Sequence, residues 1–321
     1  QFARLSVVLE EVVGRLCAEF LHSSFEPIDF ELRIDKDGLV APYSLPLPDG
    51  GTLQIKGSID RVDRMERDGK AYLRVVDYKS GGKEFLLSDV LNGLNMQMLI
   101  YLMCLWQNGA QRYGEVVPAG ILYMPVKSTP ATLGRNATQA EIDKARAKAC
   151  RMSGMVLDHS LVIDGMEDDG KGIFIPVRRE KDGGVKGTLI NLTQLSRLQK
   201  KMDGILTEMG ESLHRGEIGA VPSFGAGYDR VCDWCDYKSV CGYEPGAPVR
   251  PIEKLTHAQS LERLEKEETR HAEREWTPDQ KMRLKRAAAR CLSARRQAPA
   301  NGGARRARRP APARSDKRMR C

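Results

Sequence analysis

Two aspartates and a lysine lie on neighbouring stretches of the chain in which apolar and polar residues alternate as in β-strands. The stretches flank the dipeptide Asp68-Gly69, a strong signal for a two-residue hairpin turn. If these two residues form the turn, Asp60 faces Asp77 across the hairpin. Lys79 lies two residues beyond Asp77 and therefore on the same face of its strand. The sequence thus predicts two carboxylates and an ammonium group side by side.

Directly opposed carboxylates have Cβ atoms about 4.5 to 5.5 Å apart and repel one another unless a cation neutralises them. Carboxylate oxygens suit Mg²⁺, which keeps open positions for water and a phosphate oxygen. Lys79 could orient or help deprotonate the attacking water, or stabilise charge on the phosphate. A second interpretation stays open. Asp63 is predicted to face Arg74 in the same hairpin, so its charges could instead form a solvated face of ion pairs.

The segments GSIDRVD and VVDYKSG resemble the PD-(D/E)XK nucleases, and within them the RecB-type branch. Asp60 corresponds to the first metal-binding acid, and Asp77 and Lys79 correspond to the (D/E)xK element. Ile59 replaces the proline that names the family, as is common in this branch. The resemblance implies an α/β fold with an αβββαβ core, a restriction-endonuclease-like mixed sheet flanked by helices. It also implies a metal-dependent deoxyribonuclease that hydrolyses phosphodiesters with Mg²⁺.

The segment NGLNMQMLIYLMCLW resembles the RecB-type helix that carries a glutamine and a tyrosine four residues apart, here Gln97 and Tyr101. Gly93 continues this spacing, so the three residues are predicted to share one helix face. Alone, the spacing is typical of a packed helix surface; the resemblance implies that Gln97 and Tyr101 position the lysine or the DNA backbone. RecB-type domains usually carry an upstream histidine, and His22 lacks its surrounding pattern. We therefore expect a fragment of a longer protein that could be inactive alone.

Three of the eight cysteines are clustered in the pattern C-x2-C-x5-C, namely Cys232, Cys235 and Cys241. Such thiolates suit a zinc ion or an iron-sulfur cluster. A cysteine triad after a nuclease core resembles the 4Fe-4S segment of the AddB family of bacterial helicase-nuclease subunits, in which a fourth cysteine lies upstream of the core. No residue here matches that fourth ligand. The resemblance implies a 4Fe-4S cluster whose fourth ligand is upstream, and zinc stays the alternative.

The elements that position these residues follow from hydrophobic periodicity. We predict a helix from about Leu5 to Phe20, then a strand over residues 28–34 and the hairpin from about Thr52. Glu31 on the first strand is a further candidate for an outer-sphere carboxylate. A helix capped by Ser88 and ending at Gly109 follows, and then a buried strand over residues 117–126.

Later elements give weaker signals. Thr138 and Glu141 form a capping-box pattern for a basic helix, GMVLDHSLVIDGM is predicted as loop and short strand, and a long helix is expected from Thr193 to His214. We therefore divide the chain into four parts: a nuclease core (1–126), accessory helices and loops packed on it (127–222), a Cys-rich iron-sulfur segment (223–250), and a linker with a disordered tail (251–321).

The net charge of +8 comes from the C-terminal tail. Residues 281–321 hold 15 basic residues and one acidic residue, a net charge of +14, which leaves −6 for residues 1–280. The high pI is therefore poor support for DNA binding by the hairpin domain. The sequence has no signal peptide and no run of about 18 apolar residues. With clustered cysteines, these features favour a cytoplasmic protein with a metal site over a secreted disulfide framework.

The tail has two interpretations. Residues from about Leu261 to Met282 resemble the opening of an AddA-like helicase, a family that continues into a phosphate-binding loop. Codons for Ser293 to Asn301 can be chosen so that a frame shifted by two nucleotides encodes Ser-Ala-Ala-Ala-Gly-Ser-Gly-Lys, the expected loop. We therefore expect a frameshifted segment without packed structure beyond about residue 283. A genuine basic arm that binds DNA phosphates is the alternative.

The resemblance implies the Mg²⁺-dependent DNA exonuclease domain of a bacterial helicase-nuclease complex that processes double-strand breaks for recombinational repair. The resemblance implies that single strands from DNA ends are the substrate and that an AddA-like helicase-nuclease subunit is the partner. Two alternatives stay open. A stand-alone Cas4-like or phage exonuclease would use the same acids without that partner. A non-catalytic DNA-end-binding scaffold would not need the acid pair.

Overall fold

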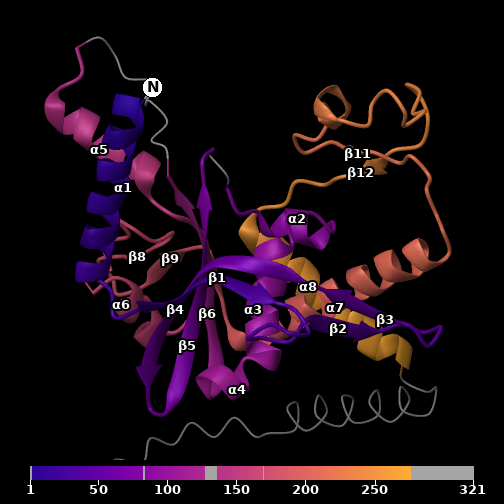
Figure 1. Ribbon diagram of the computed structural model, residues 1–321, viewed down its shortest axis with the longest axis horizontal. Coiled ribbons are helices and arrows are strands. Elements are labelled where there is room, and N and C mark those ends of the chain that lie inside the picture. The colour runs from indigo at the N-terminus through magenta and orange to yellow at the C-terminus, as the bar shows by residue number, and fades with distance from the viewer. Residues whose placement is uncertain (1, 82–83, 127–135, 169, 276–321) are drawn as a thin grey trace, which may run out of the picture. The chain divides into compact units, whose positions relative to one another are not determined.

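A six-stranded mixed sheet forms the centre of the computed structural model, which describes residues 2–81, 84–126, 136–168 and 170–275 (Figure 1). β1, β4 and β5 are antiparallel neighbours, β6 is parallel to β5, β7 is antiparallel to β6, and β10 is parallel to β7. The predicted mixed sheet with flanking helices is confirmed. In sheet order the strands are β1 (Glu26–Ile34), β4 (Gly57–Arg67), β5 (Lys70–Lys79), β6 (Glu115–Pro125), β7 (Ser153–Leu157) and β10 (Leu189–Ile190).

The turn between β4 and β5 sets the register of the hairpin. Asp68 and Gly69 have φ values of +52° and +73°, and two-residue I′ turns need a positive φ at both positions. The pairs Val62 with Val75 and Arg61 with Val76 follow from this turn. The predicted register of the hairpin is confirmed.

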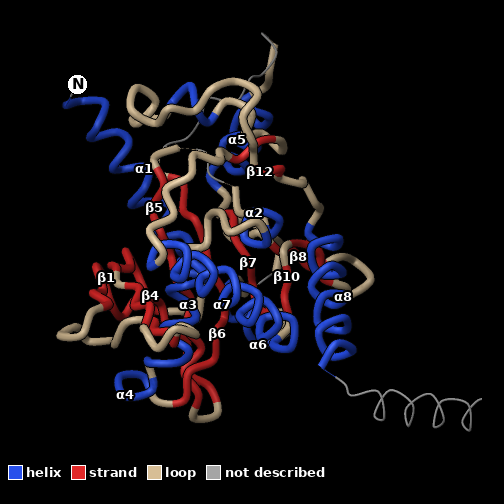
Figure 2. The backbone as a smooth tube through the Cα atoms, turned by 90° about the vertical axis from the view of Figure 1, so that its right-hand side faces the viewer, coloured by secondary structure: helices blue, strands red, loops and turns tan. Residues whose placement is uncertain are grey.

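Helices cover both faces of the sheet (Figures 1 and 2). One face buries a large apolar core beneath α2 (Leu87–Leu91), α3 (Gln97–Asn108) and α7 (Leu192–His214), with α8 (His257–Glu275) adding Leu264. The other face is covered by α1 (Phe2–Leu21), α5 (Gln139–Cys150) and α6 (Ser160–Met166). The described residues up to Glu268 form one compact unit.

Short elements complete the described chain. They are α4 (Ala110–Tyr113), the 3₁₀ turn η1 (Val231–Trp234), and three two-stranded sheets: β2 (Tyr43–Pro46) with β3 (Thr52–Ile55), β8 (Val177–Arg179) with β9 (Val185–Gly187), and β11 (Ser223–Phe224) with β12 (Arg250–Pro251). Across the described ranges, no helix is both long and apolar enough for a membrane span. The predicted tail beyond about residue 283 lies outside the described residues.

The prediction of one helix from Ser88 to Gly109 is wrong, because the structure has two helices there. Gly93 ends the first helix with a φ of +72°, and the backbone N–H groups of Gly93 and Leu94 donate to carbonyls of α2. This is the hydrogen-bond pattern with which a left-handed glycine closes a helix. The N-cap residue of α2 is Leu86, so Ser88 does not cap it. Gly93 therefore shares no helix face with Gln97.

The segment 127–222 contributes two strands, β7 and β10, to the central sheet in addition to its helices. The capping box of Thr138 and Glu141 before α5 is confirmed, and α7 corresponds to the predicted long helix. A helix, α6, replaces the loop predicted there. It forms because its apolar side chains recur at helical spacing and become buried: Val162, Ile163 and Met166.

Candidate active site

The structure brings the three predicted chemical groups to the same end of β4 and β5. The Nζ of Lys79 lies 2.5 Å from Oδ2 of Asp77. On the neighbouring strand, Oδ2 of Asp60 accepts a hydrogen bond from the backbone N–H of Tyr78 over 3.0 Å. Because Tyr78 lies between Asp77 and Lys79 in the chain, this hydrogen bond ties Asp60 to the strand that carries the other two groups.

The donor groups of this site fit a hard divalent cation. Asp77 is only 5% exposed, and its Oδ2 has no hydrogen-bond donor in the described chain. The contact with Lys79 is short enough for an ion pair but does not have hydrogen-bond geometry. A buried carboxylate oxygen without a hydrogen bond is expensive, and an oxygen-liganded ion such as Mg²⁺ would satisfy it.

The carboxylates of Asp60 and Asp77 would be the protein's acidic ligands. Within the described ranges, no group of three or more His, Cys, Asp or Glu side chains is arranged to hold a metal ion. Waters and the substrate phosphate would supply the other oxygen ligands that Mg²⁺ prefers.

Tyr123 is a member of this site that sequence reasoning missed. It lies on β6 directly beside Asp77 in the parallel pairing, and Nζ of Lys79 lies 5.7 Å from the centre of its ring. Burial, together with the negative charges of Asp77 and Asp89, raises the pKa of Tyr123 to about 12. The hydroxyl therefore stays protonated at neutral pH. The sequence predicted the strand of Tyr123 only as part of the buried core. The pairing of β6 with β5 is what places Tyr123 beside Asp77.

Asp89 links the site to the Cys-rich segment. It is a buried residue of α2 and accepts hydrogen bonds from Nδ2 of Asn95 (2.7 Å) and Oη of Tyr228 (2.9 Å). Burial and the hydrogen bond to Asp89 raise the pKa of Tyr228 to about 12, so this hydroxyl remains a donor. Tyr228 precedes the cysteines by a few residues, so the position of that segment is tied to the wall of the site.

Gln97 and Tyr101 lie together on α3, where Nε2 of Gln97 donates to Oη of Tyr101 over 3.1 Å. Tyr101 is packed against Gly57 at the start of β4: a Cβ there would lie 2.8 Å from Tyr101 Cε1 and closer still to its hydroxyl. In the part of the chain that the structure describes, neither side chain is hydrogen bonded to an acid or lysine of the site. Their recorded contacts hold α3 against β4.

A cluster of buried ion pairs supports the hairpin from the opposite face of the sheet. Asp63 pairs with Arg74 as the register predicts, over 2.8 Å, but both side chains are fully buried. The interpretation of this pair as a solvated face is therefore wrong. Glu19 of α1 contacts both Arg61 and Arg74, so two buried acids neutralise two buried arginines. Burial alone would lower the pKa of Arg61, but the charges of Asp63 and Glu19 outweigh it and raise that pKa.

This buried cluster reaches the catalytic strand through Tyr78. Nη1 of Arg61 donates to Oη of Tyr78 over 3.0 Å, and the guanidinium lies 5.6 Å from the centre of its ring. Tyr78 is thus held on one side by Arg61, while its backbone N–H holds Asp60. We infer that Arg61 helps to fix the strand that carries Asp77 and Lys79.

Two further residues considered from the sequence are His22 and Glu31. His22 directly follows α1, where its Nδ1 lies 3.0 Å from Oδ1 of Asp168 and its ring stacks on Phe174. It contacts none of the predicted catalytic groups. Glu31 accepts a hydrogen bond from Oγ of Ser58 over 3.3 Å and has a left-handed φ of +48°. Such backbone strain often marks functional sites, and Glu31 lies between Phe30 and Leu32, which pair with Arg61 and Ile59 on either side of Asp60.

The predicted cluster ligands lie on consecutive turns. Cys232 belongs to η1, Cys235 follows it, and the backbone N–H of Cys241 donates to the carbonyl of Tyr237 over 2.9 Å. Their thiols are free and half-buried or exposed. Three thiols suit soft metals, but among the described residues they are not gathered into a ligand set. The donor type fits an iron-sulfur cluster, whereas the arrangement supplies no four-ligand site.

Comparison with known proteins gives two findings. Residues 2–242 match the PD-(D/E)XK nuclease superfamily. The chain is also similar to proteins named as the B subunit of an ATP-dependent helicase/deoxyribonuclease. The protein of Acetivibrio thermocellus is 34% identical over 253 residues, which are 76% of this chain and 22% of the relative. The protein of Clostridium acetobutylicum is 33% identical over 245 residues, 75% of this chain and 21% of the relative. The chain therefore spans about a fifth of the length of these relatives.

Proposed function

Because the chain belongs to the PD-(D/E)XK nuclease superfamily, we propose that it is the Mg²⁺-dependent exonuclease part of an AddB-like helicase-nuclease subunit. One observation carries this proposal: Asp60, Asp77 and Lys79 converge at one end of the β4–β5 hairpin, where the buried carboxylate of Asp77 is ion-paired with the ammonium group of Lys79. A scaffold that only bound DNA ends would have no need for this costly arrangement.

The roles of the side chains follow from their contacts. When held by Asp60 and Asp77, Mg²⁺ would neutralise charge on the phosphate and lower the pKa of a bound water. Lys79 would orient that water or donate to a phosphate oxygen, and its ion pair with Asp77 keeps the ammonium within reach. The hydroxyl of Tyr123 beside Asp77 stays protonated at neutral pH and so adds no negative charge to the site. Gln97 and Tyr101 would position α3 and the DNA backbone beside β4.

The wider context forms part of the same proposal. The names of the similar proteins support a role beside a helicase, so we propose single-stranded DNA as the substrate, an AddA-like helicase as the partner, and double-strand break processing in the cytoplasm as the setting. The cysteine triad supports a 4Fe-4S cluster through its donor chemistry, with a fourth ligand outside the triad.

Cleavage of end-labelled single-stranded DNA by the full chain tests the proposal. Asp77→Asn and Lys79→Ala should each abolish Mg²⁺-dependent cleavage while the far-UV circular dichroism stays unchanged. Two matched controls lie on the same hairpin. Lys70→Ala removes a lysine of β5 that pairs with Glu115 over 2.7 Å, and Asp68→Asn changes an exposed turn residue. Both controls should keep activity, and full activity in Asp77→Asn or Lys79→Ala would refute the proposal.

A further inference from the structure

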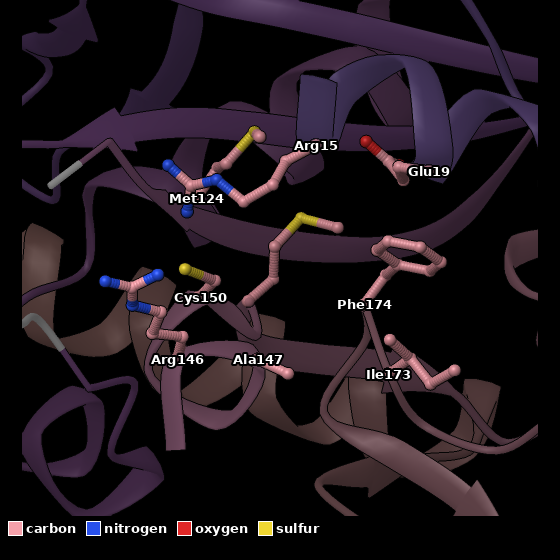
Figure 3. A pocket seen from close by; sticks show the side chains of 9 residues that line it. Arg15, Glu19, Met124, Arg146, Ala147, Cys150, Ile173 and Phe174 are labelled. Carbon is pink, nitrogen blue, oxygen red and sulfur yellow. The ribbon is translucent and has the colours of Figure 1, made fainter. Parts of the chain in front are cut away.

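A cavity of about 260 Å³ lies on the face of the sheet opposite the candidate active site (Figure 3). Its walls come from α1, β6, α5 and the segment before β8, and they are mainly apolar. Met124 and Phe174 provide much of the apolar surface, and Figure 3 shows the guanidinium groups of Arg15 and Arg146 on one side with the thiol of Cys150 between them. The cavity therefore combines a flat apolar surface with two positive charges.

The two arginines keep most of their hydrogen-bonding capacity. Arg15 donates to the backbone carbonyls of Glu11 (3.3 Å) and Pro125 (3.0 Å). Three of its five N–H groups therefore remain to donate hydrogen bonds to a ligand. Arg146 is exposed, and neither guanidinium has a carboxylate partner within the described ranges. Glu19, the acid at the cavity wall, is already engaged by Arg61 and Arg74. The mouth of the cavity thus attracts an anion.

The position of the cavity links it to the catalytic groups. Met124 follows Tyr123 on β6, so strand alternation turns Met124 toward the cavity face and Tyr123 toward Asp77. Arg15 donates to the carbonyl of Pro125, which pairs with Lys79 in the parallel β5–β6 register. A flexible DNA strand that passes the carboxyl ends of β5 and β6 would therefore meet Asp60 and Asp77 on one face of the sheet and the cavity on the other face.

We infer that this cavity is a nucleotide subsite for single-stranded DNA: one base lies in the apolar cavity against Phe174, and Arg15 and Arg146 contact the adjoining phosphates. Proteins that bind single strands combine a basic track with aromatic platforms in this way. The volume is below the range of about 300 to 1,000 Å³ for sites that enclose a whole drug-sized ligand, so it suits one base. The inference rests on the proposed function, because it assigns the substrate of that function a second contact.

Alkylation of Cys150 provides a direct readout of occupancy. The full chain is treated with iodoacetamide in EDTA, with and without a saturating single-stranded thymidine oligonucleotide, and each cysteine is quantified by peptide mass spectrometry. The oligonucleotide should slow labelling of Cys150. Cys17 is exposed on α1 and does not line the cavity, so its labelling should stay constant and serve as an internal control.

A pair of variants of α5 then tests the role of the charge. Arg146→Ala and Lys148→Ala each remove one exposed positive charge, but Lys148 does not line the cavity. Arg146→Ala should weaken protection of Cys150 and lower the salt dependence of oligonucleotide binding, a slope of about 0.7 per phosphate contact on single strands. Lys148→Ala should leave the protection of Cys150 and the salt dependence of oligonucleotide binding as they are in the unsubstituted chain.

The outcomes separate the subsite from the proposed function. Unchanged labelling of Cys150 at saturating oligonucleotide overturns the subsite, even if the chain cleaves DNA. Equal effects of Arg146→Ala and Lys148→Ala also overturn it, since they would show only general charge attraction. Protection of Cys150 that persists in Asp77→Asn, a variant that does not cleave, supports the subsite, and it would do so even if the cleavage assay failed to support a nuclease.

Discussion

The hydrogen bond between Arg61 and Tyr78 gives the most quantitative test of how the buried cluster supports the site. Tyr78→Phe removes only the hydroxyl, and the aromatic ring stays. Arg61 is fully buried, so the variant leaves one of its N–H groups without an acceptor, while Asp63 and Glu19 still neutralise the charge. Hydrogen bonds to charged groups contribute about 1.5 to 3 kcal/mol, and we expect a loss of that size in the free energy of unfolding.

Urea unfolding followed by circular dichroism measures this loss. With an m value of about 3 kcal/mol/M, the midpoint should fall by about 0.5 to 1 M at unchanged m. The matched control is Tyr237→Phe, since Tyr237 is 73% exposed and its substitution should not shift the midpoint. Tyr78→Phe should also raise the Mg²⁺ concentration needed for half-maximal cleavage, because loss of the Arg61 contact loosens the strand whose backbone N–H at position 78 holds Asp60. An unchanged midpoint together with an unchanged Mg²⁺ requirement would refute the reasoning.

Three further predictions concern packing, titration and the cysteines. Gly57→Ala should lower the unfolding midpoint, because the new Cβ would collide with Tyr101. The double variant Gly57→Ala, Tyr101→Ala should lose less free energy of unfolding than the two single variants added together. Additive losses would contradict this prediction. Burial raises the pKa of Cys104 to about 11 and that of Tyr123 to about 12. Both groups hold their protons more tightly when folded, so the free energy of unfolding should fall as pH rises from about 9 to 12; an equally steep fall in Tyr123→Phe would be the contrary result. When the upstream region is added to the chain, the anaerobically purified protein should lose bound iron in Cys235→Ser but not in Cys17→Ser, and stoichiometric zinc without iron would favour the zinc alternative.

Much of the site could be predicted because the information was local. The Asp-Gly turn and the alternation of its flanking residues determine the register, whose pairs run as far as Arg61 with Val76; one further step along the same register would place Asp60 opposite Asp77, with Lys79 on the same face. A helical break is harder to predict. The periodicity from residue 88 to 109 hides the positive φ of Gly93, and it also hides the close approach of Ile205 and Met209 of α7 to that glycine.

Non-local pairing explains what the sequence did not reveal. Tyr123 joins the site only through the parallel alignment of β6 with β5, whose connection passes through α2, α3 and α4. Arg74 was among the charges that the alternative interpretation assigned to a solvated face, and Arg61 was not singled out, because isolated charges avoid the interior. They are buried because Glu19 arrives from a distant helix and completes their neutralisation with Asp63. Neither the pairing of β6 with β5 nor the contact of Glu19 with the two arginines can be recognised from residues that lie close together in the sequence.

The central claim is that the paired acids of the hairpin hold the catalytic metal, and direct measurement of Mg²⁺ binding tests it without reference to activity. Isothermal titration of the full chain should show a Mg²⁺ site that is lost in Asp60→Asn and in Asp77→Asn but kept in Asp68→Asn, which changes the exposed turn of the same hairpin. Undiminished Mg²⁺ binding in the Asp60→Asn, Asp77→Asn double variant would contradict the account.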